Sequence, residues 1–409
     1  MISVQNRLLQ LSGNKIIALI LMGCYLSACS PKVQPTKKST PVAQQPEGEK
    51  RAPKKFTEAT ISLLVPFKLN EFRRKASSKA EVEKHAMAID FYQGFKLGLD
   101  SAAASGLNFR LNVFDTRDDN QQLDLLMRSQ RLETSNLLVG PVFPDGIKYL
   151  TPYSIAHKLP IVSPLAAQRP EEFNNPHLIS VVNNIDLHAG KMGNYITKRY
   201  SPQTSVAVLI STKSPGDEVL GQPLREYFLK EQKVLMPFME FASVYTMETK
   251  INKTKRYVVM LSSSDTKFVT ATLAKLAKMQ KAGFKIDLFG HPEWQKQNYS
   301  TEQLQALNTI ISSSYYVNFN SPSVVSFVKK YRKAYLFEPG EYAFKGFDLG
   351  LYFGRQLSQH GAKFMQHLPQ ERFRGLHNSL SFVKDDQYGY VNTSLMLLRY
   401  RGYALNMIE

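Results

Sequence analysis

Two short apolar stretches each end in a small residue followed by proline, and both endings carry groups that could hold a ligand. The first reads LLVGPVFPD over 137–145 and includes Phe143 and Asp145; the second reads LPIVSPLAA over 159–167 and includes Ser163 and Ala166. Free N–H groups where a helix begins after such a strand bind anionic groups readily. The two endings could therefore grip a ligand between them, although two ordinary loops of an α/β protein would show the same pattern.

Catalytic and metal-binding patterns do not occur elsewhere in the sequence. The eight His residues include no pair at metal-ligand spacing and no HExxH motif. The chain also has no GxSxG, no Gly-rich phosphate loop and no SxxK with its companion motifs. Asp385 and Asp386 are adjacent acids, but they stand in KDDQYG, which predicts a hairpin turn. We therefore expect that the protein is not an enzyme.

Strands and helices alternate along the chain from Thr60 onward, and the alternation restarts after residue 185. The first series has predicted strands at 61–66, 109–114, 137–140 and 160–162 and helices at 81–105, 120–132 and 147–156. The second has strands at 205–210, 238–244, 257–261, 286–290 and 310–317 and helices at 187–199, 216–231 and 266–282. Long helices return at 321–335 and 341–359. This pattern predicts an α/β protein with two doubly wound parallel-sheet lobes, in which ligands bind at the carboxyl ends of the strands.

The N-terminus has the pattern of an export signal. Arg7 and Lys15 precede an apolar run of 13 residues, 16–28, which is too short to span a bilayer comfortably. The run ends in Leu-Ser-Ala before Cys29, which resembles the lipobox of bacterial lipoproteins. That resemblance implies removal of residues 1–28 and a lipid on Cys29. An ordinary secretory signal or an uncleaved anchor is the alternative.

The lipobox resemblance also implies a location in the bacterial cell envelope. Ser30, where an Asp could stand, favours the outer membrane over the inner membrane if the host has both. Cys24 would leave with the signal, so the mature chain would have no free thiol and no disulfide.

Residues 29–58 are predicted to be a disordered basic tether. Over 30–55 the sequence holds seven Lys or Arg, two Glu and five prolines, and no aromatic residue that could help to bury a core. Such a segment lifts a domain off a membrane, and it can also rest on anionic headgroups. The whole chain has a net charge of +18. Its basic residues are dispersed and no nucleic-acid-binding motif occurs, so we expect no nucleic acid partner.

Several stretches, taken in order, resemble the type I periplasmic-binding family, which includes the branched-chain amino-acid receptors of ABC transporters. They are ISLLVPF, FYQGFKLGLDSA, FDTRDD, LLVGPVF, LPIVSPLAA, the segment 258–290 and EYAFKGFDLGLYFGRQL, and together they cover roughly 60–409. The resemblance implies two lobes joined by a three-segment hinge that closes on a ligand, with no metal or cofactor. It divides the chain into lobe 1, residues 59–184 and 320–380, and lobe 2, residues 185–319 and 381–409.

The family's amino-acid site transfers only in part to the first lobe. Amino-acid-binding members use a Ser after the third strand, where this chain has Phe143 and Pro144. Asp145 would repel a carboxylate there, and its alternative role is the N-cap of the following helix. Ser163 matches the family at the fourth strand, whose loop continues through Ala166. We therefore expect Phe143, Asp145, Ser163 and Ala166 near the ligand, but not a simple branched-chain amino acid as that ligand.

The first crossover and the second lobe supply four more candidates. Asn183 and Asn184 stand where the family often has Phe-Arg-Thr, and they either bind the ligand or only form a turn. Trp294 follows a strand and either stacks on the ligand or packs under a loop. Of two adjacent tyrosines at 315 and 316, one is expected in the core and Tyr316 in the cleft.

Two functions remain open from the sequence. One is a lipid-anchored solute-binding protein that captures a small polar molecule, amino-acid-like or other, and passes it to a permease. The other is a non-catalytic interaction module, similar to the outer-membrane lipoproteins that activate cell-wall synthases. The departures in the ligand loops, together with Ser30, suit the interaction module better than they suit a typical receptor.

Overall fold

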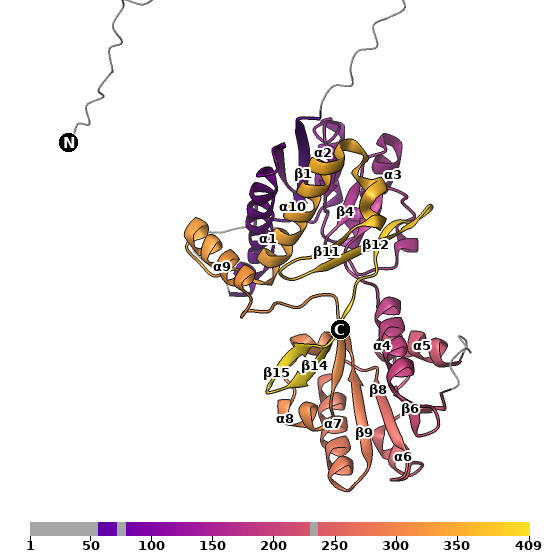
Figure 1. The fold of residues 1–409 in the computed structure, drawn as a ribbon. Coiled ribbons are helices and arrows are strands. Elements are labelled where there is room, and N and C mark those ends of the chain that lie inside the picture. Colours follow the sequence, from indigo (N-terminus) through magenta and orange to yellow (C-terminus); the bar gives the residue numbers. More distant parts are fainter. Residues whose placement is uncertain (1–55, 72–78, 230–235) are drawn as a thin grey trace, which may run out of the picture. The chain divides into compact units, whose positions relative to one another are not determined.

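The computed structural model describes residues 56–71, 79–229 and 236–409 of the chain. The predicted signal, Cys29 and the tether up to residue 55 lie outside these residues. The described residues belong to one unit, 55–409, which contains two sheets of mostly parallel strands (Figure 1). None of the helices among them combines the length and apolarity that a membrane span requires.

The lobe-1 sheet has eight strands in the order β11-β12-β13-β5-β4-β3-β1-β2. Its parallel strands are β1 (Glu58–Val65), β2 (Asn108–Asp115), β3 (Leu137–Val139), β4 (Ile161–Ser163), β5 (Leu178–Ser180) and β13 (Gly389–Asn392). The antiparallel edge consists of β12 (Ser379–Asp385) and β11 (Arg372–Arg374). Residues of β1 alternate between two cores, with Leu63 on one face of the sheet and Leu64 on the other. The sheet is therefore covered by helices on both faces, as the sequence predicted.

One face of the lobe-1 sheet is covered by α1 (Lys79–Ala103) and α10 (Glu341–His360), which lie side by side (Figure 1). The other face carries α2 (Asn120–Arg128) and α3 (Pro144–His157). Helix α9 (Pro322–Tyr335) packs against α10 through Phe327 and Phe344, and the 3-10 helices η2 (Pro170–Glu172) and η4 (Gly361–Gln370) complete the lobe.

Close contact between α1 and α10 depends on glycines. A Cβ on Gly94 would lie 1.9 Å from the carbonyl oxygen of Ala343, and one on Gly346 would lie 2.2 Å from that of Phe91. Only glycine allows the two backbones to approach this far. The approach fixes the position of the first turn of α10, and that turn reaches the cleft described below.

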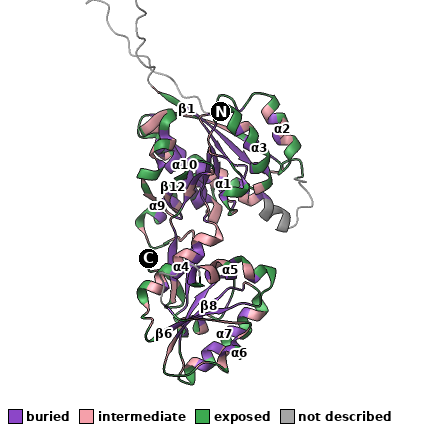
Figure 2. Cartoon of the chain, turned by 90° about the vertical axis from the view of Figure 1, so that its right-hand side faces the viewer, coloured by how far each residue is buried: buried purple, intermediate pink, exposed green. Residues whose placement is uncertain are grey.

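The lobe-2 sheet has seven strands in the order β15-β14-β10-β9-β8-β6-β7. The parallel strands are β6 (Ser205–Ile210), β7 (Phe238–Phe241), β8 (Arg256–Leu261), β9 (Lys285–Gly290) and β10 (Ile310–Ser313); β14 (Met396–Arg401) and β15 (Ala404–Met407) run antiparallel. Its helices are α4 (Ile185–Arg199), α5 (Pro215–Leu229), α6 (Val244–Glu248), α7 (Thr266–Lys281), η3 (Pro292–Lys296) and α8 (Thr301–Ala306). Figure 2 shows the central strands of both lobes buried, while edge strands such as β7 and β15 are partly exposed and the helices turn their exposed residues outward.

Three connections join the lobes, after β5, after β10 and after β13. The last connection lies later in the chain than we expected from the sequence. Residues 381–392 were assigned to lobe 2, but β12 and β13 pair with β5 in the lobe-1 sheet, so the chain leaves lobe 1 only after Asn392. The predicted hairpin about DDQYG is the β12–β13 turn, where Asp385 accepts the N–H groups of Gln387 and Tyr388.

Candidate functional site

A cleft of about 1170 Å³ is lined by residues of both lobes. Lobe 1 contributes the loops after β3 and β4 and the first turns of α10; lobe 2 contributes the starts of α4 and α5, η3 and the residues after β10. Most of these segments follow the carboxyl ends of parallel strands, which is where doubly wound sheets bind ligands. A cleft of this size can hold a small molecule.

The two strand endings of lobe 1 both reach the cleft, but not through all the side chains that we predicted. Phe143 and Ala166 line it. Ser163 is 1% exposed and does not line the cleft, and its Oγ has no hydrogen-bond partner among the described residues. Asp145 does not line the cleft either, and it is not the N-cap: α3 begins at Pro144, so Phe143 occupies the cap position and Asp145 lies in the first turn.

Asn183 and Asn184 line the cleft and also support the hinge. Asn184 caps α4 by accepting the N–H of Leu187 at 3.1 Å. The Nδ2 of Asn183 donates to the carbonyl of Asn392 at 2.7 Å, and the Nδ2 of Asn392 donates to the carbonyl of Val181 at 2.9 Å. These reciprocal bonds tie the first connection between the lobes to the third.

Trp294 belongs to the core of lobe 2. It is fully buried, and its indole Nε1–H donates to the carbonyl of Ser263 at 3.0 Å. The ring packs edge-on against Tyr299 and lies against Gly290, where η3 turns back over the end of β9. No surface of the ring is left for a ligand, so the packing alternative describes Trp294 and the stacking alternative does not.

The two adjacent tyrosines occupy the opposite positions from those we expected. Tyr315 lines the cleft and stacks on His377, with ring centroids 4.4 Å apart and planes at 1°. Tyr316 packs against the lobe-2 core. The prediction relied on alternation along a strand to residue 317, but β10 ends at Ser313 and both tyrosines lie in the second connection. There the N–H of Tyr316 donates to the carbonyl of His377.

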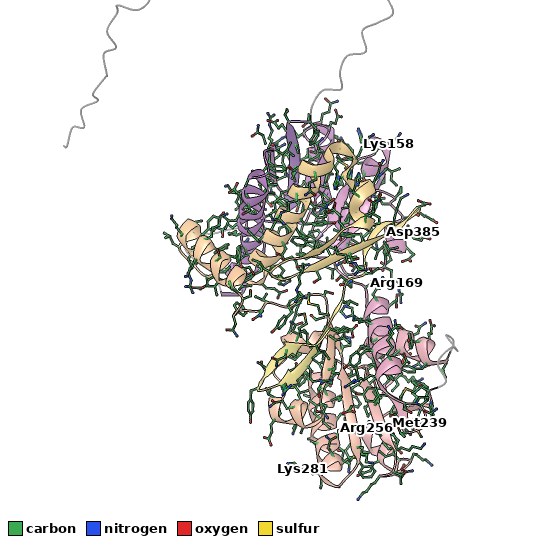
Figure 3. The ribbon with its side chains drawn as sticks, viewed as in Figure 1. Lys158, Arg169, Met239, Arg256, Lys281 and Asp385 are labelled. Atoms are coloured by element: carbon green, nitrogen blue, oxygen red, sulfur yellow. The ribbon has the colours of Figure 1, made fainter. Side chains whose placement is uncertain are left out.

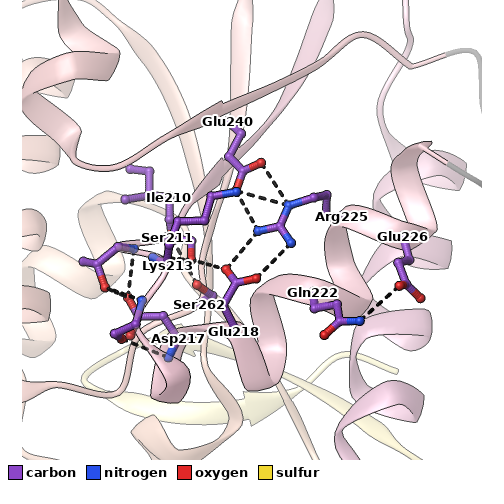
Figure 4. A network of polar contacts seen from close by, with 12 residues as sticks. Ile210, Ser211, Lys213, Asp217, Glu218, Gln222, Arg225, Glu226, Glu240 and Ser262 are labelled. Atoms are coloured by element: carbon purple, nitrogen blue, oxygen red, sulfur yellow. Dashed lines mark hydrogen bonds and ion pairs between the residues drawn. The ribbon is translucent and has the colours of Figure 1, made fainter.

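Most charged side chains at the cleft have a partner within the protein. Arg225 donates to both Glu218 and Glu240 through several bonds of 2.8–3.3 Å, and Lys213 pairs with Glu240 at 2.8 Å (Figure 4). Hydrogen bonds from Arg225 hold the pKa values of Glu218 and Glu240 below their usual range. Glu218 lines the cleft, but its carboxylate is already paired with Arg225 of the same helix, α5.

A further ion pair connects the lobes beside the first connection. Arg169, in the loop after β4, binds Asp186 in the first turn of α4 with two bonds of 2.5 and 2.8 Å. Figure 3 shows Arg169 at the edge of lobe 1 that faces α4, whereas Asp385 lies at the outer end of the β12–β13 hairpin. Both partners are substantially exposed, so salt would screen the pair.

Helix α10 also carries a buried carboxylate, that of Asp348, which does not itself line the cleft. Asp348 is fully buried and accepts the backbone N–H groups of Leu376, His377 and Asn378, each at 2.8 Å. Burial raises the pKa of Asp348 to about 6, although the three donors act in the opposite direction. These bonds fix the loop that carries His377, and His377 in turn contacts Tyr315 in the cleft.

Two histidines of lobe 2 also line the cleft, and both are held neutral. The ring of His188 lies 2.9 Å from Ser312 Oγ and 3.3 Å from Ser314 Oγ, and burial lowers its pKa to about 3. Burial also lowers the pKa of His291, whose side chain caps η3 by accepting the N–H of Glu293. Among the described residues, no group of three His, Cys, Asp or Glu side chains is arranged to hold a metal ion.

One signal of this site in the sequence was overlooked. Lys345 and Asp348 are charged residues three positions apart on a long helix, and Tyr352 and Gln356 continue the same buried face. Residues three and four apart share one side of a helix, so the spacing places a polar stripe beside Phe344 and Leu349. A charged residue at a buried helical position is costly and therefore informative.

No protein-family model matches the chain, and no curated protein matches it in sequence. Among solved structures, a candidate branched-chain amino acid ABC transporter protein from Rhodospirillum rubrum is similar, with 15% identity, a TM-score of 0.63 and coverage of 86% of this chain and 99% of that one. An ABC transporter substrate-binding protein from Desulfitobacterium hafniense in complex with Leu has 14% identity, a TM-score of 0.53 and coverage of 86% and 100%. The C-domain of LpoA from Haemophilus influenzae, a regulator of PBP1A, has 15% identity, a TM-score of 0.54 and the same coverage. These similarities confirm the predicted fold.

Proposed function

We propose that this chain, which has the fold of the type I periplasmic binding proteins, captures a small polar molecule in the cleft between its lobes and is not an enzyme. The observation that carries the proposal is the cleft itself, about 1170 Å³ in volume and lined from both lobes. A ligand that contacts both lobes stabilises whichever arrangement of the lobes gives it the most contacts. Binding of that kind can be read by a permease or by another partner.

The cleft chemistry supports a ligand other than a simple branched-chain amino acid. Phe143 and Pro144 line the position after β3, and Ser163 lies buried behind the cleft surface. The Desulfitobacterium protein was solved with Leu, but the similarity to it supports only the shared fold. We propose a polar ligand that carries a negatively charged group.

We further propose that the chain is anchored in the cell envelope through lipid on Cys29, with the basic segment between Cys29 and the start of β1 at Glu58 as its tether. The support is the sequence around Cys29 and the likeness to substrate-binding proteins. Labelling of cells with an alkyne fatty acid would detect the lipid. Incorporation into the wild-type protein and not into Cys29→Ser is expected, and equal labelling of both would contradict the proposal.

A second candidate is a non-catalytic regulator of cell-wall synthesis. The LpoA C-domain is similar over its whole length, with a TM-score close to that of the Leu-bound protein. In this case surface contacts with a wall enzyme carry the function, and the cleft need not be filled.

A thermal-shift screen separates the two candidates. The panel contains amino acids, peptides, muropeptides, organic acids and neutral sugars, each at a concentration well above millimolar dissociation constants. A ligand at 100 times its dissociation constant stabilises the folded state by about 2.7 kcal/mol. At least one shift is expected for a solute-binding protein. No shift with any compound, together with capture of a purified wall synthase, would replace the first candidate by the second.

A further inference from the structure

Lys345 is a buried lysine in the wall of the cleft. It lies in the second turn of α10, is only 8% exposed, and lines the cleft from the lobe-1 side. Its backbone position is fixed because Gly346 packs directly against the backbone of α1. Removal of an ammonium group from water is costly unless a partner replaces the water.

The carboxylate of Glu341 lines the same cleft and acts on Lys345, but it does not pair with it. Glu341 is four residues before Lys345 on the same helix, a spacing at which Glu and Lys commonly pair. Its Oε1 instead lies 3.8 Å from Nε2 of His377. Lys345 has no ion pair or hydrogen bond with any residue that the structure describes, and Glu341 acts on it only at longer range. Burial lowers the pKa of Lys345 to about 8, so it still carries a proton at neutral pH.

A second free cation faces the same space from lobe 2. Lys296, at the end of η3, lines the cleft and has no ion pair within the described part of the chain. It is close enough to Lys345 to lower that residue's pKa further. The other two cations of the cleft are engaged, since Lys68 lies 3.9 Å from Asp118 and Arg169 binds Asp186.

We propose that Lys345 and Lys296 form the two halves of an anion site, in which a carboxylate or phosphate group of the ligand bridges lobe 1 and lobe 2. Like charges repel across an empty cleft, and an anion between them turns that repulsion into attraction from both sides. Tyr315, stacked on His377 at the same wall, offers a hydroxyl and a ring face beside the anion. The inference rests on the proposed ligand-binding function and specifies the chemical class of its ligand.

The test uses succinate and inorganic phosphate as probes and succinamide as the neutral match for succinate. Melting temperatures are measured at constant ionic strength for the wild type, Lys345→Met, Lys296→Met and the control Arg355→Met, whose side chain is exposed on the same helix. The affinity of the better probe is then measured by calorimetry. The two anions also distinguish a carboxylate ligand from a phosphate ligand.

The expected result is a shift of the wild type and of Arg355→Met by at least one anion and none by succinamide. Each lysine variant should lose about tenfold or more in affinity. Equal shifts in wild type and Lys345→Met, or no shift with either anion, would overturn the anion site. The solute-binding proposal would survive either of those outcomes if a neutral sugar or an amino acid in the wider screen stabilised the protein.

Discussion

Replacement of Lys345 by Met should make the protein more stable at neutral pH. The lysine is 8% exposed and lacks an ion pair among the described residues, so its charge is not compensated. Met has a similar length and no charge, and it should pack in the same space against α1. A stability gain from loss of a lysine would be unusual for a surface position, where such changes stay within about 0.5 kcal/mol.

The magnitude follows from the lowered pKa. Burial takes the pKa of Lys345 from its ordinary value of 10.5 to about 8 in the folded protein. At about 1.36 kcal/mol for each pH unit of difference, the charged amine costs the folded state about 3 kcal/mol at pH 7. Lys345→Met removes this cost, so its free energy of unfolding should exceed that of the wild type by up to about 3 kcal/mol.

The pH dependence of the free energy of unfolding tests the direction of this stability change independently. Between pH 8 and pH 10.5 the unfolded chain binds the lysine proton more strongly than the folded protein does, so wild-type stability rises with pH in that window. The advantage of Lys345→Met should therefore shrink, to about 1.4 kcal/mol at pH 9.5 by the same relation.

Urea titrations at pH 7 and pH 9.5 measure both effects, with Arg355→Met as the control variant expected to change stability by less than about 0.5 kcal/mol. The m-values of the variants should match that of the wild type. A Lys345→Met protein that is less stable than wild type at pH 7, or an advantage that does not change with pH, would refute the reasoning that Lys345 is an uncompensated buried charge.

Three further changes have defined outcomes. Asn392→Ala removes the Nδ2 bond to the carbonyl of Val181 and the Oδ1 acceptor of the Ser381 and Ser394 N–H groups, and should lower the free energy of unfolding by about 2–4 kcal/mol in urea titrations; a loss below about 1 kcal/mol would contradict that role. Trp294→Ala should cost about 3–5 kcal/mol as a core truncation, whereas Trp294→Phe should keep the ligand affinity of the wild type; lost affinity in Trp294→Phe would return the ring to the ligand site. Arg225→Met should raise the pKa of Glu218, because the folded-state pKa is held low by that arginine. The wild-type advantage over Arg225→Met should therefore be present at pH 7 and fade as the pH falls below the ordinary Glu value of 4.5 and through the lowered folded-state pKa, and an advantage that does not decrease in acid would argue against the ion pair as its source.

The fold could be predicted from the sequence because its signals are local. Apolar runs such as SVAVLI at 205–210 and caps such as Asp265 mark strands and helix starts without any long-range information. The glycines of α1 and α10 lie in two helices that the family resemblance assigned to lobe 1, and the structure shows why both need glycine. What failed was the end of β10, since no Gly or Pro stands between 313 and 317 to mark where the strand stops.

The site was predicted less well because it depends on contacts between distant segments. The position of Trp294 after a strand left open whether it stacks on a ligand or packs under a loop, and only the fold shows that η3 turns it back under the loop. Lys345 was missed because its lack of a partner cannot be known until Glu341 is seen to face His377. Similar loops after β3 and β4 gave the position of the cleft correctly, while the side chains at those loops did not give its chemistry.

The central claim is that a small molecule binds in the cleft between the lobes. Calorimetric titration of the tightest compound from the screen into Ala167→Trp tests it most directly, since Ala167 is exposed in the cleft and an indole there fills space that the ligand needs. Ala103→Trp, at the exposed end of α1 and outside the cleft lining, is the matched control. We predict that Ala167→Trp loses at least about tenfold in affinity, about 1.4 kcal/mol, while Ala103→Trp binds as the wild type does. Wild-type affinity in Ala167→Trp would contradict the claim that the cleft is the binding site.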